Sequence, residues 1–389
     1  MSKVIPPKEA GDGPFFLYDE RELHANVGRM RDAWKRVNSA RFSVFYSVKA
    51  NPNPHVLRAL VPIVEGFDVS SLEELEMVVR LGVVPGRITV SGPAKNRAFL
   101  ERAVQLRVHS IHVDSAEELR ELRSLAPGTW VPRLTLRVAD PALPTAKLGF
   151  AGDALEAVLS GERGTIAGLH MYLGRESFEA ARVLGQLGAL ASLRARHAAA
   201  FTAGFELFVG PGLPSWTALD PGLDPFLGKA KAFPFPVNVE AGRAIAGTAG
   251  AYGAEVLSVK EGPGARPCVI IAGGVHHLGS SLISPSFGTK GLTCEAWRGG
   301  NPLNEATRPC SIYGSLCLAN DIVHPHADLP AGLARGDWLL FRPCGAYGIT
   351  AAASQFIGLP RPKELMIGMN GALRDVSPLW EAYHRSFGS

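Results

Sequence analysis

The sequence predicts an α/β protein in which a (β/α)8 barrel is joined to an all-β domain. Between residues 42 and 243, short apolar runs alternate with amphipathic segments of helical periodicity, and eight such units in series indicate a closed barrel. After Arg243 the helical periodicity fades and Gly/Pro turns separate the apolar runs, as in all-β domains. Polar residues recur where the expected barrel strands end, which is the end of a barrel that carries active sites. We expect the barrel to span residues 26–243.

Each expected barrel strand is a short apolar run that stops at a turn or at a helix-start signal. Ser70 or Ser71 can cap the helix that follows the second strand, and Ser115 can cap the helix that follows the fourth. In chain order, the expected strands are 42–49, 64–71, 88–93, 110–115, 134–140, 165–174, 205–212 and 236–243.

The second domain is expected to combine residues 1–25 with residues 244–389 in a β-sandwich or β-barrel that contributes to a dimer and to the active site. Phe15–Tyr18 precedes the first barrel helix, so it should add a strand to this domain. Residues 285–309 hold few apolar side chains and many Gly, Pro and Asn, which predicts a loop over a site or interface. The clearest apolar runs are Ala254–Val259, Pro267–Ile271, Asp337–Phe341 and Ser354–Ile357.

The composition is that of an ordinary soluble globular protein. A net charge of +4 over 389 residues, without a Lys/Arg block interleaved with aromatics, argues against a nucleic-acid partner. No apolar run is long enough for a membrane span, and the first residues lack the apolar core of a signal peptide. The five cysteines are odd in number and widely spaced, which fits neither a disulfide framework nor a zinc site. We therefore expect the protein to reside in a reducing cytoplasm and to bind no metal.

Lys49 is the most informative single residue. It ends the apolar run 42–48, and the turn Ala50–Pro54 follows at once, which places its amine at the C-terminal rim of a strand. A lysine that loses water there can be neutral, and a neutral amine can form a Schiff base with an aldehyde cofactor. For one lysine alone, a strand end that reaches into water is the simpler interpretation.

Further polar residues and glycines at strand ends support a shared site at this rim. Each has a structural interpretation of its own, since His170 can be a buried core histidine and Asp68 can cap a helix. Their recurrence at the same end of successive strands favours convergence on one barrel mouth. With Lys49, the candidates are Asp68, Arg137, His170, Gly210, Gly212, Glu240, Gly242 and Arg243.

Five segments in order carry recognisable motifs, and together they resemble one family. The segments are Tyr46–Asn51, Glu65–Ser71, Val239–Arg243, Gly314–Asp321 and Gly345–Tyr347. They are similar to motifs of the fold-type III pyridoxal phosphate-dependent decarboxylases, which include ornithine, diaminopimelate and arginine decarboxylases. The resemblance covers most of the chain. It implies an alanine-racemase-like barrel, pyridoxal 5′-phosphate as cofactor, and a homodimer with composite active sites.

The resemblance also implies roles for single residues. Lys49 would hold the cofactor covalently, and His170 would lie against one face of its ring. Glu240 would face the ring nitrogen and keep it protonated, which makes the ring a deep electron sink; the racemases of this fold place an arginine there. Cys317, from the partner subunit, would deliver the proton after CO2 leaves, although a buried small thiol is the ordinary interpretation of one cysteine. The phosphate would be held by Gly210, Gly212, Gly242, Arg243 and Tyr347.

Departures from the family pattern bear on the phosphate and on the substrate. Pro211 removes one N–H donor from the first phosphate segment. Leu318 stands where diamine-forming enzymes carry an aspartate, and a buried leucine cannot compensate a distal ammonium. The histidine motif is two residues longer than usual and has Arg175 near its end, and the run 272–278 with His277 is unlike that of ornithine decarboxylases.

These departures resemble a branch of the family that acts in secondary metabolism on carrier-linked or conjugated amino acids. Arg175 or His277 would then meet a carboxylate or a phosphopantetheine arm, with Leu318 and Asp321 as further substrate contacts; surface or interface roles are the alternative for Arg175 and His277. The predicted function is decarboxylation of such an amino acid in secondary-metabolite or siderophore biosynthesis. The alternatives are a decarboxylase of a free basic amino acid or diaminopimelate, a non-catalytic regulatory binding protein, and a racemase.

Overall fold

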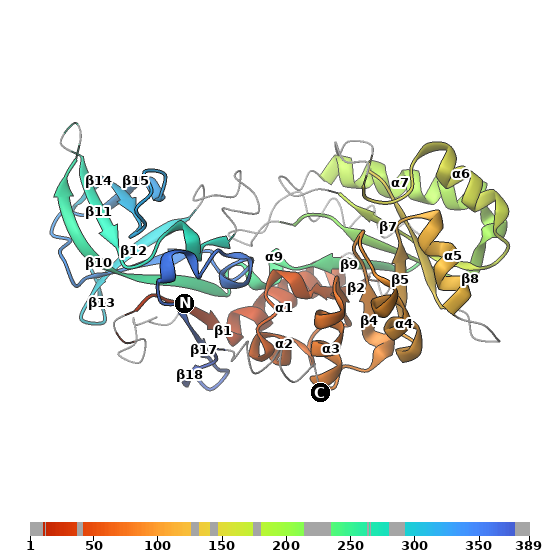
Figure 1. Cartoon of the computed structure of the whole chain (residues 1–389), viewed down its shortest axis with the longest axis horizontal. Helices are drawn as coiled ribbons and strands as arrows, with labels where there is room; N and C mark the ends of the chain where they lie inside the picture. Colours follow the sequence, from red (N-terminus) through yellow and green to blue (C-terminus); the bar gives the residue numbers. More distant parts are fainter. Residues whose placement is uncertain are drawn as a thin grey trace. The chain divides into compact units, whose positions relative to one another are not determined.

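The computed structural model describes residues 11, 13–36, 42–125, 132–140, 147–173, 180–213, 235–262, 264, 266–279 and 292–377 (Figure 1). The chain forms two compact units. One is His24–Ile245, and the other combines Met1–Leu23 with Ala246–Ser389. Among the helices in the described ranges, none has both the length and the apolar character needed to cross a membrane.

The unit His24–Ile245 contains a closed barrel of eight strands, which confirms the predicted (β/α)8 fold (Figure 1). All neighbours pair in parallel, and β2 closes the ring with β9 from Phe42↔Val237 to Tyr46↔Ala241. β8 begins at Phe201 rather than at residue 205, and Phe201 packs there against Phe205 with ring centroids 5.0 Å apart. The strands are β2 (Phe42–Ser47), β3 (Gly66–Val69), β4 (Ile88–Val90), β5 (Ser110–Val113), β6 (Leu134–Val138), β7 (Ile166–Tyr172), β8 (Phe201–Gly210) and β9 (Val237–Ala241).

Helices follow the strands and lie outside the barrel (Figure 1). Ser71 Oγ accepts the N–H of Glu74 at 3.1 Å where α3 begins, and Ser115 Oγ accepts the N–H of Glu118 at 3.2 Å where α5 begins. Both predicted caps are present, and each satisfies an N–H that the helix leaves unpaired. The α-helices are α1 (Glu20–Arg36), α2 (Pro54–Leu60), α3 (Leu72–Arg80), α4 (Arg97–Leu106), α5 (Ala116–Leu125), α6 (Gly152–Gly161), α7 (Ala180–Arg196) and α9 (Arg243–Ala246).

Alternate residues of each barrel strand face the interior and form layers there. Phe45 of β2 and Phe208 of β8 contribute to an aromatic layer, with ring centroids 5.7 Å apart. Gly66 of β3 makes room for it, because a Cβ at that position would lie 2.2 Å from the Phe45 ring. The interior is therefore packed rather than open.

At the N-terminal end of the barrel strands, a partly buried polar cluster surrounds Glu206 of β8. Its carboxylate accepts a hydrogen bond from Asn238 Nδ2 at 2.8 Å and pairs with Arg133 Nη2 at 2.8 Å. Nε2 of His109 lies 3.0 Å from Oε2 of the same carboxylate. Burial acts to raise the pKa of Glu206, but these partners outweigh burial and lower it. The negative charge at this end is balanced by a guanidinium and two further donors.

The second unit is built on a ten-stranded sheet, as the prediction of an all-β domain requires. β1 lies between β10 and β17, antiparallel to the first and parallel to the second, which confirms that Phe15–Tyr18 adds a strand. Phe15 and Leu17 of β1 pack in the core with Leu340 and Leu365. The strands are β1 (Phe15–Asp19), β10 (Gly250–Glu261), β11 (Pro267–Ile271), β12 (Thr293–Arg298), β13 (Asn301–Pro302), β14 (Thr307–Tyr313), β15 (Ile322–Pro330), β16 (Trp338–Arg342), β17 (Lys363–Ile367) and β18 (Leu373–Asp375).

Two details expected of this unit are wrong. The expected loop 285–309 contains strands β12 and β13 and the start of β14, while residues 280–291 lie outside the described ranges. β12 pairs with β16 up to Trp297↔Trp338, so cross-strand contacts outweigh a composition rich in Gly, Pro and Asn. The apolar run Ser354–Ile357 forms no strand, and the 3-10 turn Phe356–Gly358 overlaps it.

Candidate active site

Lys49 lies in the 3-10 turn Val48–Ala50, which follows β2 directly. Its Nζ is 3.4 Å from Oδ2 of Asp68, and Asp68 pairs in register with Ser47 on the neighbouring strand β3. The Asp68 carboxylate is fully buried, whereas the Lys49 side chain is 46 % exposed. Oδ1 of Asp68 is buried without a hydrogen-bond partner in the described part of the chain. The structure therefore brings two predicted site residues together at the barrel rim, an accessible amine beside a buried anion.

Glu74 is an ionisable group near this pair that the sequence analysis did not place in the site. It lies in the first turn of α3, where its carboxylate accepts the backbone N–H of Ser70 at 2.7 Å. Burial raises the pKa of Glu74 to about 7, with Asp68 acting in the same direction and the charge of Lys49 opposing it. A carboxyl group that titrates near neutrality and interacts with an amine is suited to proton exchange. Its sequence signal is weak, because acids in a first helical turn are ordinary.

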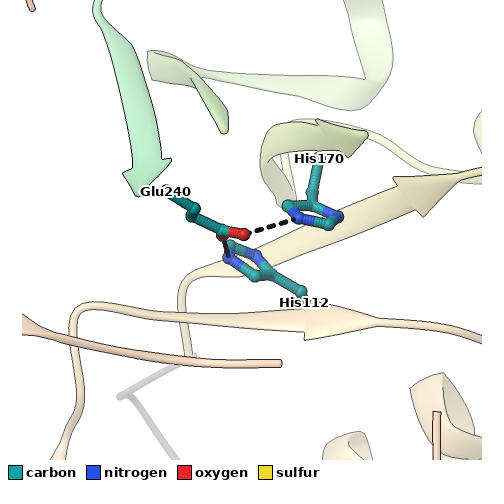
Figure 2. Close-up of side chains that lie close together, drawn as sticks. All are labelled: His112, His170 and Glu240. Atoms are coloured by element: carbon teal, nitrogen blue, oxygen red, sulfur yellow. Dashed lines mark hydrogen bonds and ion pairs between the residues drawn. The ribbon is translucent and has the colours of Figure 1, made fainter. Parts of the chain in front are cut away.

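Glu240, His170 and His112 converge inside the barrel from β9, β7 and β5 (Figure 2). Oε2 of Glu240 is 3.1 Å from Nε2 of His170, and Oε1 is 3.0 Å from Nε2 of His112. The two imidazole rings stack, with centroids 4.5 Å apart and an interplanar angle of 17°. All three side chains are buried. Glu240 and His170 are site residues predicted from the sequence, whereas the sequence pattern assigns His112 only to a strand.

Burial sets the charge state of this cluster. It lowers the pKa of His170 to about 4, against the opposing effect of Glu240. Burial acts to raise the pKa of Glu240, but the interactions with His170 and His112 outweigh it and hold that pKa well below its usual range. At neutral pH the carboxylate is therefore charged and the His170 imidazole is neutral. No lysine or arginine forms an ion pair with Glu240 among the residues that the structure describes.

The same three residues carry donor atoms that lie within 4.8 Å of one another, a set that can bind a transition metal. In this structure each imidazole Nε2 is instead hydrogen-bonded to a carboxylate oxygen of Glu240. The remaining ring nitrogens, Nδ1 of His112 and of His170, are buried and have no hydrogen-bond partner in the described ranges. The expected absence of a metal stays a prediction.

Arg137 of β6 is held at the rim by a second charge cluster. Its Nη1 is 3.5 Å from Oδ1 of Asp114, which follows β5. Lys95 Nζ lies 3.2 Å from Oδ2 of Asp114 and 2.9 Å from Oε1 of Glu118. The Lys95 side chain is fully buried, and these two carboxylates compensate its charge while the carbonyl oxygen of Gly92 accepts a further hydrogen bond from its Nζ. The predicted site residue Arg137 is thus oriented by a residue from the neighbouring strand end.

Glycines at the ends of β8 and β9 keep the rim free of side chains. A Cβ at Gly210 would lie 2.9 Å from the Tyr172 ring and 3.6 Å from Oε2 of Glu240. A Cβ at Gly242 would lie 2.6 Å from the Cβ of Ala50, so the turn after β9 packs closely on the turn that carries Lys49. Gly212 has a φ of +67°, which favours glycine, and Arg243 opens α9.

In the second unit, Cys317 and Leu318 lie on an exposed turn after β14. Leu318 is 45 % exposed, so the expectation of a buried leucine is wrong for the single chain. The reason is that the turn is anchored by its backbone, with Gly314 N donating to Asp321 O at 2.9 Å and Ser315 N donating to Gly273 O at 2.6 Å. The side chains between these anchors are left facing outward.

Asp321 is a structural anchor rather than an available substrate contact. It is buried, and its Oδ1 accepts the N–H of Val275 while its Oδ2 accepts the N–H of Leu316, each at 2.9 Å. A Cβ at Gly274 or Gly314 would lie 2.5 Å or 2.1 Å from the carboxylate. The prediction that Asp321 contacts substrate is therefore replaced by a role in holding the cysteine turn.

The remaining predicted residues fall in three different situations. His277 is buried, with Nδ1 2.9 Å from the hydroxyl of Tyr252, and burial lowers its pKa to about 3. A neutral, enclosed imidazole cannot serve as a cationic contact, so this expectation is not supported. Tyr347 has a φ of +53°, and it follows Gly345, where a Cβ would lie 1.9 Å from the carbonyl oxygen of Ala246. Arg175 lies outside the described residues.

The fold and the rim are those of a (β/α)8 barrel with a lysine at the mouth, and comparisons with known proteins show what the chain is similar to. Residues 24–192 match the family model for the pyridoxal-binding domain of pyridoxal-dependent decarboxylases. The chain is 27 % identical over 387 residues to the L-glutamyl-[BtrI acyl-carrier protein] decarboxylase of Niallia circulans, covering 91 % of this chain and 88 % of that one. It is 29 % identical over 368 residues to the diaminopimelate decarboxylase of Deinococcus radiodurans, covering 91 % and 89 %.

Solved structures share the whole fold. A diaminopimelate decarboxylase from Helicobacter pylori, complexed with L-lysine, aligns with a TM-score of 0.77 at 21 % identity over 98 % of both chains. An arginine decarboxylase from Paramecium bursaria Chlorella virus, bound to agmatine, aligns with a TM-score of 0.78 at 21 % identity over 91 % of this chain and 97 % of that one. Over most of its length this chain is similar to pyridoxal-dependent decarboxylases, and its barrel matches their pyridoxal-binding domain. Its cofactor is pyridoxal 5′-phosphate, and it is a carbon–carbon lyase.

The residues at the rim fit this cofactor. Lys49 offers an accessible amine for an aldehyde, and Gly210 and Gly242 leave room where a Cβ would crowd the rim. Glu240 is a buried carboxylate that pairs with no lysine or arginine in the described chain. A protonated pyridine nitrogen is a cation of the size and kind that such a site stabilises.

Proposed function

We propose that this enzyme removes CO2 from the α-carbon of an amino acid that is linked to a carrier protein or otherwise conjugated, in the biosynthesis of a secondary metabolite or siderophore. The observation that carries the decarboxylase chemistry is Glu240, a buried anion whose only hydrogen-bond partners in the described chain are imidazoles. Such an anion would keep the cofactor ring nitrogen protonated, and a protonated ring favours decarboxylation over racemisation.

The rim residues would divide the work of holding the cofactor. Lys49 would bind its aldehyde carbon, with Asp68 orienting the amine from 3.4 Å. Bound there, pyridoxal phosphate supplies an electron sink for the pair left on the α-carbon when CO2 departs. Glu240 would hold the proton at the ring nitrogen, while His170 would restrain one face of the ring. Arg137 would be a further contact, positioned by Asp114.

The phosphate of the cofactor would lie at the glycine turns after β8 and β9. Backbone N–H groups that approach a phosphate without Cβ atoms in between form a suitable cradle. Pro211 contributes no N–H donor to it. The proposed phosphate contacts are Gly210, Gly212, Gly242, Arg243 and Tyr347.

Cys317 would donate the proton that replaces the carboxyl group at the α-carbon. Its thiol is exposed on the single chain, and the turn that carries it is anchored by Asp321. An outward-facing thiol on an anchored turn suits insertion into the barrel of a partner in a two-fold dimer, which is also part of this proposal. Cys317→Ala should lower turnover by more than it weakens cofactor binding, whereas equal losses would make the thiol structural.

Two observations support a substrate that is bulky or anionic beyond its α-carbon. Leu318, beside the proposed proton donor, is an apolar side chain and cannot compensate a distal ammonium. The similarity to the Niallia circulans enzyme, named for a glutamyl group on an acyl-carrier protein, points the same way. Arg175 stays a candidate contact for a carboxylate or a phosphopantetheine arm.

The test compares CO2 release from L-glutamate loaded on a phosphopantetheine carrier protein with release from free diaminopimelate, ornithine, lysine and arginine. We expect the carrier-bound substrate to be preferred by at least about a hundredfold in kcat/KM, the scale on which a polar pocket rejects a mismatched group. Robust turnover of a free amino acid would contradict the substrate assignment and leave the decarboxylase assignment standing.

A decarboxylase of a free amino acid is the second candidate. Relatives named as diaminopimelate decarboxylases match over 91 % of this chain, including those of Helicobacter pylori and Deinococcus radiodurans. The same assay decides between the two, because each substrate class is present in it. No observation favours the regulatory binding protein or the racemase.

A further inference from the structure

We infer that His112 is a positioning residue for the cofactor site, which fixes the Glu240 carboxylate and backs the His170 ring. This inference rests on the proposed role of Glu240 at the cofactor ring nitrogen. No motif of the sequence assigned His112 to the site, and its place in the barrel alone brings it there (Figure 2).

The hydrogen bonds immobilise the carboxylate. Each oxygen of Glu240 has its own imidazole, His112 at 3.0 Å on Oε1 and His170 at 3.1 Å on Oε2. A carboxylate held at both oxygens cannot rotate about its terminal torsion without losing one of these bonds. Each oxygen retains a second lone pair, so either can still accept the proton of a ring nitrogen.

The donors also fix the imidazole tautomers. A charged carboxylate only accepts hydrogen bonds, so each Nε2 must carry the hydrogen of its own bond to Glu240. The His170 imidazole is neutral at neutral pH, so its Nδ1 bears a lone pair, and Nδ1 of both rings is buried without a partner in the described ranges. Orphaned buried acceptors cost free energy, and such a cost is tolerated where the arrangement serves a site.

Stacking determines which face of His170 is available. His112 covers one face, at a centroid distance of 4.5 Å and an interplanar angle of 17°. The Phe208 ring also contacts His112, with ring centroids 4.7 Å apart and an interplanar angle of 57°. A cofactor ring that lies against His170 would therefore use the face opposite His112.

Two pairs of variants separate this role from simple packing. His112→Phe keeps a ring of similar shape and removes the N–H donor, whereas His112→Gln places an amide N–H near the Nε2 position and removes the ring. We expect His112→Phe to weaken pyridoxal phosphate binding about tenfold to a hundredfold, the effect of losing one hydrogen bond to a charged group. We expect His112→Gln to bind the cofactor within a fewfold of wild type. A packing role predicts the reverse order.

The second pair, His112→Asn and His112→Gln, keeps the test valid if His112→Phe does not fold. His112→Asn has the polarity of His112→Gln but a side chain too short to reach Oε1, so it should bind the cofactor as weakly as His112→Phe. The readout is the dissociation constant from fluorescence titration of cofactor-free protein with pyridoxal phosphate. Equal dissociation constants for His112→Asn and His112→Gln would overturn the inference.

Controls come from the other end of the barrel and from Glu240 itself. His109→Phe and His109→Gln alter the equivalent contact to Glu206 and should leave the dissociation constant unchanged. Glu240→Gln should weaken cofactor binding. If it binds like wild type, the proposed function fails and the inference fails with it. If Glu240→Gln is weak while His112→Phe binds like wild type, the inference alone is overturned.

Discussion

The two ends of the barrel hold the same pair of residue types in different electrostatic surroundings. His109 contacts Glu206 at the N-terminal end, and His112 contacts Glu240 at the C-terminal end, each pair at 3.0 Å. Glu206 is also paired with the guanidinium of Arg133 at 2.8 Å. Glu240 has a second imidazole instead, and no lysine or arginine in the described chain pairs with it.

The difference separates a charge that stabilises the fold from a charge that awaits a ligand. At the first end the carboxylate is matched within the protein, so the cluster contributes to folding. At the second end a buried carboxylate keeps its charge through two hydrogen bonds, and a bound cation would stabilise it further. Among the described residues, two buried ring nitrogens without a hydrogen-bond partner, Nδ1 of His112 and of His170, lie at the second end, and Nε of Arg133 is the unpaired atom at the first.

The largest expected effect is at the cofactor end. Lys49→Ala should abolish the absorption of the bound cofactor near the visible edge and lower decarboxylation at least about a thousandfold, because it removes the group that holds the cofactor. Arg133→Ala, at the other end, should keep the absorption band. Absorption spectra of both purified variants make the check, with circular dichroism as the control for folding. A band that survives in Lys49→Ala would contradict the account.

The next effect is on stability. Glu206→Ala should lower the free energy of unfolding by about 1–2 kcal/mol, because it leaves the buried donor of Asn238 and the partly exposed donors of Arg133 and His109 without their acceptor. Urea denaturation measures the loss, and the cofactor dissociation constant of the folded variant should not change. If Glu206→Ala lost cofactor affinity without losing stability, Glu206 would belong to the cofactor site, and the contrast drawn between the two ends would be wrong.

The pH dependence sharpens the same contrast. The pKa of Glu206 is lowered on folding, so its contribution to stability is present above the pKa of the unfolded chain and is lost as the pH falls through the folded pKa. Wild type should therefore lose stability in acid more steeply than Glu206→Gln, whose amide does not titrate. Urea denaturation midpoints between neutral pH and acid give the two slopes, and parallel slopes would exclude Glu206 as a source of acid sensitivity.

The smallest effect tests whether nearness to the rim is enough to affect the site. Ser71→Ala should lower the free energy of unfolding by about 1 kcal/mol, since it removes the cap of α3, and Ser115→Ala should do the same at α5. Neither should change the cofactor dissociation constant. A selective loss of cofactor affinity in Ser71→Ala would extend the site to the start of α3.

The barrel could be predicted because its strands are apolar runs with polar ends, and the register of parallel strands brings those ends together. Lys49, Asp68 and Glu240 were found from that pattern. His112 was missed because its meaning depends on Glu240, which lies far along the chain and becomes its neighbour only when the barrel closes. Its inward position could have been found from the alternation that places His112 and Asp114 on the same face of their strand.

The second unit was harder to predict in detail. The Gly- and Asn-rich residues around β12 indicate a loop. The strand forms nevertheless, because it pairs through backbone groups that do not depend on composition. The exposure of Leu318 and the burial of Asp321 depend on the backbone hydrogen bonds that hold one turn. The hydrophobic periodicity of the sequence does not reveal those hydrogen bonds.

The central claim is that Glu240 holds the cofactor ring nitrogen in its protonated form. Nitrogen-15 NMR of the enzyme loaded with pyridoxal phosphate labelled at the ring nitrogen measures this directly. The account predicts the chemical shift of a protonated nitrogen in wild type at neutral pH and that of an unprotonated nitrogen in Glu240→Gln. An unprotonated nitrogen in wild type, or the same shift in both proteins, would contradict it.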